Sequence, residues 1–321
     1  MNKEIKRKII YNVNVYRSVL ILLVMCIVAS LLSPSFLSMT NIFNVFKQIT
    51  VSGIVACGMT YVILTGGIDL SVGSIVGLSG ALSAGVLLAT GNVFLATITG
   101  MGVGLICGAA NGVLVAKCGI PPFIATLGMM TFLRGGVLVY TQGSPISVKS
   151  DMFKYIGKGD ILGIPVPVIL LVVLFILGHF ILTKTRFGRN VYALGGNKEA
   201  ARLSGISIKK TEWIVYIISG FLAGIAAIVL TARLGSAQST SGSGIEMDAI
   251  AAVILGGTSL SGGTGFILPT VVGAMIMGII DNILTLMNVN PHATNIVKGA
   301  VIIIAVLVDK KVKDLSAKAD Q

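Results

Sequence analysis

The sequence predicts an all-α polytopic membrane protein, a single transmembrane domain over residues 1–321 with about ten helices that cross the bilayer. Composition is the first reason: 55% of the 321 residues are hydrophobic, 11% are charged, and the mean hydropathy is +0.95. A soluble domain of this size would need a far more polar surface. The second reason is that apolar stretches recur, many of them close to the roughly 20 residues that a helix needs to span a bilayer.

The placement of positive charge is the third reason. The formal net charge is +12, with 24 lysines and arginines against 12 acidic residues. Two thirds of these basic residues lie in an N-terminal tail (1–17), a central loop (184–211) and a C-terminal tail (309–321). The positive-inside rule places all three segments in the cytoplasm. The charge therefore indicates topology, and we expect no nucleic-acid partner.

The first two spans are predicted to differ in length. Residues 18–32 form an uncleaved first helix, and residues 41–47 form an interfacial turn of helix. The second span then begins near Thr50 and reaches Gly66 after only about 16 residues, which is short for a bilayer crossing. We therefore expect an interruption within the membrane at this point.

The segment that follows is the predicted interruption. Gly66 and Gly67 can break a helix, and Asp69 can cap the next one by accepting its free amide hydrogens. Helix breaks inside membranes are tolerated where the backbone is buried in protein or lines a wet cavity. Asp69 is therefore either a helix cap alone or part of a translocation pathway, with Ser71 and Ser74.

Later apolar stretches supply the remaining spans. The third ends at Thr90 and the eighth follows Asp248, and the others are expected at about 93–115, 123–140, 165–182, 213–231, 266–286 and 293–308. The polar segment 141–163 then lies outside, and an even count puts both termini and the central loop inside. Four glycines should let other helices approach the fourth span closely: Gly100, Gly102, Gly104 and Gly108.

The second half of the chain repeats part of the first. Residues 52–74 and 243–265 share Ser-Gly-Ile, Val-Ile-Leu, Gly-Gly and Leu-Ser in the same order, with Thr65 as an extra residue. The correspondence pairs Gly66-Gly67 with Gly256-Gly257, Asp69 with Ser259, and Ser71 with Ser261. Paired interrupted helices are a transporter architecture and point to the pathway. Chance similarity of glycine-rich apolar sequence is the alternative.

The central loop is predicted to contain one short helix. Asn197 is a favourable N-cap, Glu199 lies in the first turn, where the helix dipole favours an anion, and Gly205 can take the left-handed conformation that ends a helix. One face of this helix would be small and mildly apolar, with Ala200, Leu203 and Ser204. Such a face can dock on a partner, or the loop only connects two spans.

Motifs separate the functional classes. The chain has no HExxH or G-x-S-x-G motif and no group of carboxylates and histidines at useful spacing, so an embedded enzyme lacks its residues and we expect no metal or cofactor. A transporter remains. It also lacks G-x-x-x-x-G-K-[ST], so it uses either an ion gradient or a separate ATPase.

Two sets of residues resemble a known family. Glu199-Ala200-Ala201, followed after three residues by Gly205, resembles the EAA-x-x-x-G signature of permease subunits in bacterial ATP-binding cassette importers, without its downstream Leu-Pro. Residues 64–74, 192–206 and 248–265 are similar to ribose-type and other simple-sugar importer permeases. The resemblance extends over nearly the whole chain.

The resemblance implies an assembly in the bacterial cytoplasmic membrane. Its members would be a cytoplasmic ATP-binding subunit, an extracytoplasmic sugar-binding protein and a second permease copy. The ATPase would dock on a set of coupling residues: Asn197, Glu199, Ala200, Ala201, Arg202, Leu203 and Gly205.

The expected cargo is ribose or a similar sugar. Polar groups for its hydroxyls would come from Asp69, Ser71, Ser74, Ser259 and Ser261, which otherwise only cap helices. Asp248 would contact the binding protein, close an extracellular gate or cap its helix. The alternatives are xylose, galactose or a furanose-like signalling molecule as cargo, and an ion-coupled secondary carrier.

Overall fold

A computed structural model describes residues 3–319, with side chains described over 18–290 and 292–307. This part of the chain folds into thirteen α-helices, one π-helical turn and four two-residue strands. The helices are α1 (Lys3–Leu32), α2 (Met39–Leu64), α3 (Val72–Thr90), α4 (Val93–Gly112), α5 (Pro122–Thr141), α6 (Asp151–Lys158), α7 (Val166–Lys184), α8 (Arg186–Gly196), α9 (Lys198–Leu203), α10 (Ile208–Leu234), α11 (Ile245–Leu255), α12 (Ile267–Leu286) and α13 (Pro291–Ala319). The π-helical turn η1 (Val113–Lys117) extends α4, and the strands are β1 (Ile146–Ser147), β2 (Asp160–Ile161), β3 (Ile164–Pro165) and β4 (Ser236–Ala237).

The all-α membrane class is confirmed. Among the described residues, seven helices are long and apolar enough to cross a membrane: α2, α3, α4 with η1, α5, α7, α10 and α12. Shorter apolar segments lie in α1 (18–32) and α13 (292–307), and α11 has only 11 residues. The count of ten crossings therefore stays a prediction.

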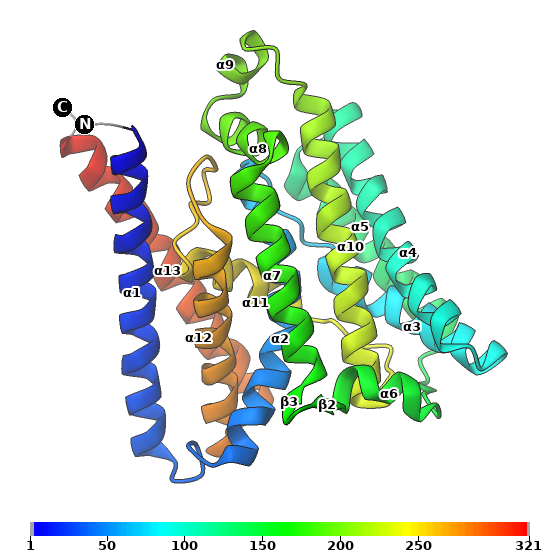
Figure 1. The fold of residues 1–321 in the computed structure, drawn as a ribbon. Helices are drawn as coiled ribbons and strands as arrows, with labels where there is room; N and C mark the ends of the chain where they lie inside the picture. Colours follow the sequence, from blue (N-terminus) through cyan, green and yellow to red (C-terminus); the bar gives the residue numbers. More distant parts are fainter. Residues whose placement is uncertain (1–2, 320–321) are drawn as a thin grey trace.

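The long helices lie side by side in one bundle (Figure 1). The start of α1, the end of α13, and both α8 and α9 lie at one end of it, and α6 with the β2–β3 hairpin lies at the other. The second strand pair, β1 with β4, joins the chain after α5 to the chain after α10. The three basic segments thus gather at one end, as their charge requires if that end faces the cytoplasm.

The predicted interfacial turn at 41–47 and the predicted start of the second span near Thr50 are wrong, because α2 is one helix of 26 residues from Met39. Its N-cap is Ser38, whose hydroxyl accepts the Asn41 amide hydrogen at 3.3 Å. Asn41 looked interfacial because it is polar. It is instead buried against Asn282 of α12, and the two amide groups exchange hydrogen bonds of 3.0 and 2.7 Å.

Close approach of α4 and α10 builds the centre of the bundle. Gly104 and Gly108 of α4 lie directly on the backbone of Gly220 and Gly224 in α10, with no space for a Cβ atom. Gly100 packs on Ile228 of α10 in the same row. The prediction for Gly102 is wrong, since a Cβ there would meet nothing within 4 Å. The reason is helical spacing: positions 100, 104 and 108 share one face, and position 102 lies on the opposite one.

Other boundaries also differ from the sequence predictions. The predicted tails are not separate from the bundle helices, because α1 begins at Lys3 and α13 continues to Ala319. The segment 141–163 contains the short helix α6, capped by the Ser150 hydroxyl and anchored by the fully buried Phe153. The central loop holds two helices where one was predicted, since α8 precedes α9.

Candidate functional site

The short helix α9 has the predicted local structure. Asn197 is its N-cap, and the Asn197 side-chain oxygen accepts the Ala200 amide hydrogen at 2.9 Å. Glu199 lies in the first turn, and Gly205 has a φ of +78° just beyond the helix. The Ile206 amide bonds to the Ala201 carbonyl, which closes the end of the helix. Both predicted caps are confirmed.

The side chains of α9 divide into an outer and an inner set. Leu203 is 81% exposed, and Ala200 and Ser204 of the predicted docking face are exposed too. Arg202 pairs with Glu199 at 2.9 Å on the outside, where an ion pair contributes little stability. Ala201 is different from the other predicted coupling residues, because it is only 3% exposed and packs inward.

An ion pair ties α9 to the bundle. Lys198 lies 2.7 Å from Glu212 of α10, and the Glu212 side chain is only 10% exposed. Partial burial strengthens such a pair relative to a surface one. The pair joins the first residue of α9 to a residue near the start of α10. Glu212 is not among the residues predicted from the sequence. The sequence shows it only as a lone acid next to Trp213, at the start of an apolar span.

The end of α8 connects this region to both helix breaks. Gly195 lies against the Leu64 carbonyl at the end of α2. A Cβ atom at position 195 would overlap this carbonyl and would lie 2.5 Å from the Gly263 nitrogen. The Gly263 amide in turn donates to the Leu64 carbonyl at 2.9 Å, and the Tyr192 hydroxyl donates to the Gly265 carbonyl at 2.7 Å. We call these five residues the junction.

The sequence placed the junction residues inside motif stretches but could not bring them together. More than a hundred residues of chain separate Leu64 from the 192–195 segment. About seventy residues separate that segment from the 263–265 segment. Glycine at 195 and 263 was their only signal, because close backbone approach requires a residue without a side chain.

The two helix breaks begin with the same turn. In each, one amide hydrogen bonds to the carbonyl three residues earlier, and the next amide hydrogen bonds to the carbonyl five residues earlier. The bonds are Gly66 to Ile63 (2.9 Å) and Gly67 to Val62 (3.1 Å) in the first break, and Gly257 to Ile254 (2.8 Å) and Thr258 to Val253 (3.1 Å) in the second. Gly66 and Gly257 both have positive φ, +79° and +84°. Gly66 therefore corresponds to Gly257 and Gly67 to Thr258, so the extra residue lies between Gly67 and Asp69 rather than at Thr65.

Asp69 lies in the first break and is completely buried. One carboxylate oxygen accepts the Ser71 amide at 3.0 Å and the Ser71 hydroxyl at 2.7 Å, and the other accepts the Ser219 hydroxyl of α10 at 3.1 Å. Asn111 of α4 donates to the Ser71 hydroxyl at 2.7 Å. The carboxylate thus joins α3, α4 and α10 at the start of α3, as a buried anion must be hydrogen-bonded to be tolerated.

Ser259 occupies the equivalent place in the second break. Its hydroxyl accepts the Ser261 amide at 3.2 Å, two residues on, as Asp69 accepts the Ser71 amide. Ser259 is buried and Ser261 is exposed. Ser74 is buried in the first turn of α3. Of the five polar residues predicted for the pathway, four are therefore buried and Ser261 is exposed.

Asp248 does not cap α11. The N-cap is Gly244, and the Asp248 carboxylate lies 3.0 Å from Lys298 of α13. Lys298 also pairs with Asp281 of α12 at 2.9 Å, and all three side chains are only 15–17% exposed. The helix-cap interpretation is therefore wrong. The Asp248 carboxylate pairs instead with Lys298, which is 50 residues later in the chain and close in space.

Comparison with known proteins places the chain in a family. A family model described as the branched-chain amino acid transport system permease component matches residues 41–306. The ribose import permease protein RbsC of Escherichia coli (strain K12) is 48% identical over 299 residues, 92% of this chain and 93% of the relative. RbsC of Bacillus subtilis (strain 168) is 48% identical over 90% of this chain and 91% of its own length, and the D-allose permease AlsC of E. coli (strain K12) is 42% identical over 92% and 91%.

No solved structure matches the chain. The family model covers well over half of the residues, and the relatives align along almost their whole length. The helix breaks, the junction and α9 all lie within the matched residues. The chain therefore belongs to this family of permease components of transport systems.

Proposed function

We propose that this chain is the membrane permease subunit of an ATP-binding cassette importer for ribose or a similar monosaccharide. Ribose import permeases that are 44–48% identical over most of the chain support the proposal. The D-allose and L-arabinose permeases, 42% and 35% identical, keep another small sugar as the alternative cargo. Because the sequence lacks a phosphate-binding loop motif, ATP is hydrolysed by a separate subunit.

The observation that carries the proposal is the form of α9. It projects from the end of the bundle (Figure 1) and presents Leu203, 81% exposed, beside small residues. Burying an exposed leucine in a contact removes apolar surface from water and contributes about 1.5 to 3 kcal/mol. In the proposed assembly, the ATPase binds Leu203 and the capped helix around it.

Coupling then follows from the contacts of α8 and α9. When ATP binding moves the docked ATPase subunits, α9 pulls on α10 through Lys198 and Glu212, and α8 pulls on both helix breaks through the junction. The permease needs two conformations with different affinities for the ATP-bound partner. The breaks are the places where the helices can change direction between them.

The remaining assembly is proposed with it. Two permease copies form the pathway in a bacterial cytoplasmic membrane, a sugar-binding protein delivers cargo from outside, and both termini and α9 lie in the cytoplasm. Ten segments cross or enter the bilayer, with the repeated breaks at 65–71 and 256–266 inside it. Asp69, Ser71 and Ser259 hold the two breaks in shape in this proposal, and sugar contacts lie elsewhere.

A pair of leucine variants tests the docking. Leu203→Asp puts a charge into the proposed contact, whereas Leu162→Asp makes the same change at another exposed leucine (98%) in the β2–β3 turn, at the opposite end of the bundle. The measurement is co-purification of the ATPase encoded beside this chain, followed by ATP-driven uptake of labelled ribose in proteoliposomes. We expect Leu203→Asp to lower both at least tenfold and Leu162→Asp to leave co-purification unchanged.

Three outcomes would contradict the proposal. Equal co-purification in the two variants would remove α9 as the docking site. Uptake by the chain alone, lost when an ionophore collapses the ion gradient, would identify a secondary carrier. Uptake of xylose or galactose in preference to ribose would keep the importer and change its cargo.

A further inference from the structure

Two polar hollows adjoin at the end of the bundle opposite α9. The outer one, about 690 Å³, opens beside the α12–α13 connection and is lined by hydrogen-bonding side chains that include Asn288, Asn290 and Asn295. The inner one, about 130 Å³, lies between α2, α10, α11 and α12. Gln48 and Asp281 line both, so they stand where one hollow meets the other. We call the two together the vestibule.

The charges of the vestibule cancel. Arg233 of α10, Asp248 of α11 and Asp281 of α12 line the inner hollow, and Lys298 holds both carboxylates at about 3 Å. Arg233 donates to the Lys47 carbonyl at 3.0 Å, so a backbone oxygen fixes its position. These two cations and two anions sum to zero net charge, so the vestibule does not favour a charged ligand. Their polar groups can still form hydrogen bonds with the hydroxyl groups of a neutral ligand.

Apolar side chains complete the inner wall. Leu230, Ile245 and Met277 line the inner hollow together with Gln48 and Ser52 of α2. A sugar ring has hydroxyls at its edge and C–H groups on its faces, so it needs both kinds of surface. Carboxylates and amides match hydroxyls well, because a carboxylate accepts several hydrogen bonds and an amide both accepts and donates them.

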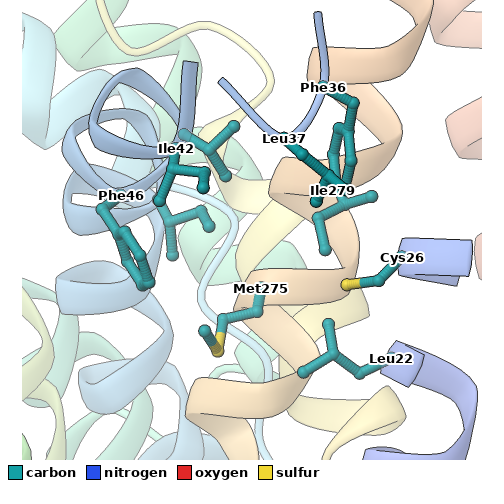
Figure 2. Close-up of a pocket in the computed structure, with 10 residues that line it drawn as sticks. Leu22, Cys26, Phe36, Leu37, Ile42, Phe46, Met275 and Ile279 are labelled. Atoms are coloured by element: carbon teal, nitrogen blue, oxygen red, sulfur yellow. The ribbon is translucent and has the colours of Figure 1, made fainter. Parts of the chain in front are cut away.

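Another cavity shows the contrast (Figure 2). It holds about 220 Å³ between α1, α2 and α12, and its wall consists of side chains such as Leu22, Phe46 and Met275. A sugar there would leave its hydroxyls without partners, at a cost of about 1 to 3 kcal/mol for each buried polar group. This apolar cavity suits hydrocarbon, and it offers no place for the cargo.

We propose that the vestibule is the first sugar-binding site on the permease, where a neutral monosaccharide released by the binding protein makes hydrogen bonds to Gln48 and Asp281. The inference rests on the proposed function and adds a location and a ligand class to it. The site excludes sugar phosphates, because Lys298 is already paired with the two carboxylates and the Arg233 guanidinium donates to a backbone carbonyl, so the phosphate would lie beside two carboxylates without a cation of its own. Gln48 lines both hollows, so a sugar in either one lies beside it.

The test compares Gln48→Leu with Gln238→Leu, an equal change at an exposed glutamine outside the vestibule lining. The assembled importer without binding protein is placed in nanodiscs, and saturation-transfer NMR measures binding of D-ribose and of ribose 5-phosphate. We expect a ribose signal in the wild type and in Gln238→Leu, none in Gln48→Leu, and none for the phosphate in any sample. Ribose uptake with all partners present should fall about tenfold in Gln48→Leu.

The outcomes are distinguishable. If the wild type takes up no ribose, the proposed function fails before the vestibule is tested. If it takes up ribose and Gln48→Leu equals Gln238→Leu in both measurements, or if ribose 5-phosphate binds as well as ribose, the vestibule is not the site. Should Gln48→Leu fail to insert, Ser52→Ala replaces it, with an expected loss of about fivefold in uptake.

Discussion

Replacing Gly195 by alanine should uncouple ATP hydrolysis from transport. The alanine Cβ would overlap the Leu64 carbonyl and lie 2.5 Å from the Gly263 nitrogen, whereas ordinary contacts begin at 3.4 Å. Both neighbours are backbone atoms, so neither can rotate away. The end of α8 must therefore separate from the two helix breaks that it joins.

The magnitude follows from what is lost at the junction. Overpacking of one methyl group costs about 1 to 3 kcal/mol. The 2.9 Å bond from the Gly263 amide to the Leu64 carbonyl is strained by the same displacement, which removes about 1 kcal/mol. Alanine is better than glycine in a helix by about 0.5 to 1 kcal/mol. The net destabilisation is thus about 1 to 3 kcal/mol, concentrated where α8 contacts the breaks.

Gly196→Ala is the matched control, because a Cβ at position 196 meets nothing within 4 Å. The assay measures sugar moved per ATP hydrolysed in proteoliposomes, together with the thermal midpoint of the purified permease. We expect Gly195→Ala to lower the transport ratio about tenfold and the midpoint by a few degrees, with Gly196→Ala unchanged in both. If the two variants behave alike, the junction does not transmit motion.

Three further predictions concern the bundle. Gly104→Val should force α4 from α10 and cost about 2 to 3 kcal/mol of stability, whereas Gly102→Val should be silent in the same thermal melt, since only position 104 contacts α10. Asp69→Leu should destabilise by about 3 kcal/mol by leaving buried donors unpaired, while Asp69→Asn should keep ribose uptake; loss of uptake in a stable Asp69→Asn protein would instead indicate a pathway role. Lys298→Met should cost about 3 to 5 kcal/mol by removing the ion-pair partner of two largely buried carboxylates, and adding Asp281→Asn should recover part of that stability; a melt of the single variant that equals the wild type would refute the pairing.

Local chemistry explains why parts of the candidate site were predictable. An N-cap needs only a suitable side chain before a helix, and a left-handed helix end needs a glycine, so Asn197 and Gly205 were identified from a few residues of sequence. The row of Gly100, Gly104 and Gly108 was visible for the same reason. The prediction of close packing at Gly102 was wrong, because residue type alone does not say which face of the helix a glycine occupies.

Long-range pairing explains the errors. Asn41 was predicted to be interfacial, but its side chain exchanges two hydrogen bonds with Asn282, 241 residues later in the chain. A helix cap was one predicted role for Asp248, but its carboxylate forms an ion pair with Lys298. A polar residue in an apolar segment has several possible partners, and the sequence does not say which one the fold brings within 3 Å.

By itself, the sequence determined the membrane class, the basic end of the bundle and the short capped helix α9, because hydropathy, charge and capping act within one segment or its immediate neighbours. Only the tertiary structure decided that Gly195 meets both helix breaks, that Glu212 holds α9 to α10, and that Gln48 and Asp281 share one polar hollow. These contacts join residues that are far apart in the chain. They depend on how helices pack against one another, and packing is a property of the whole bundle.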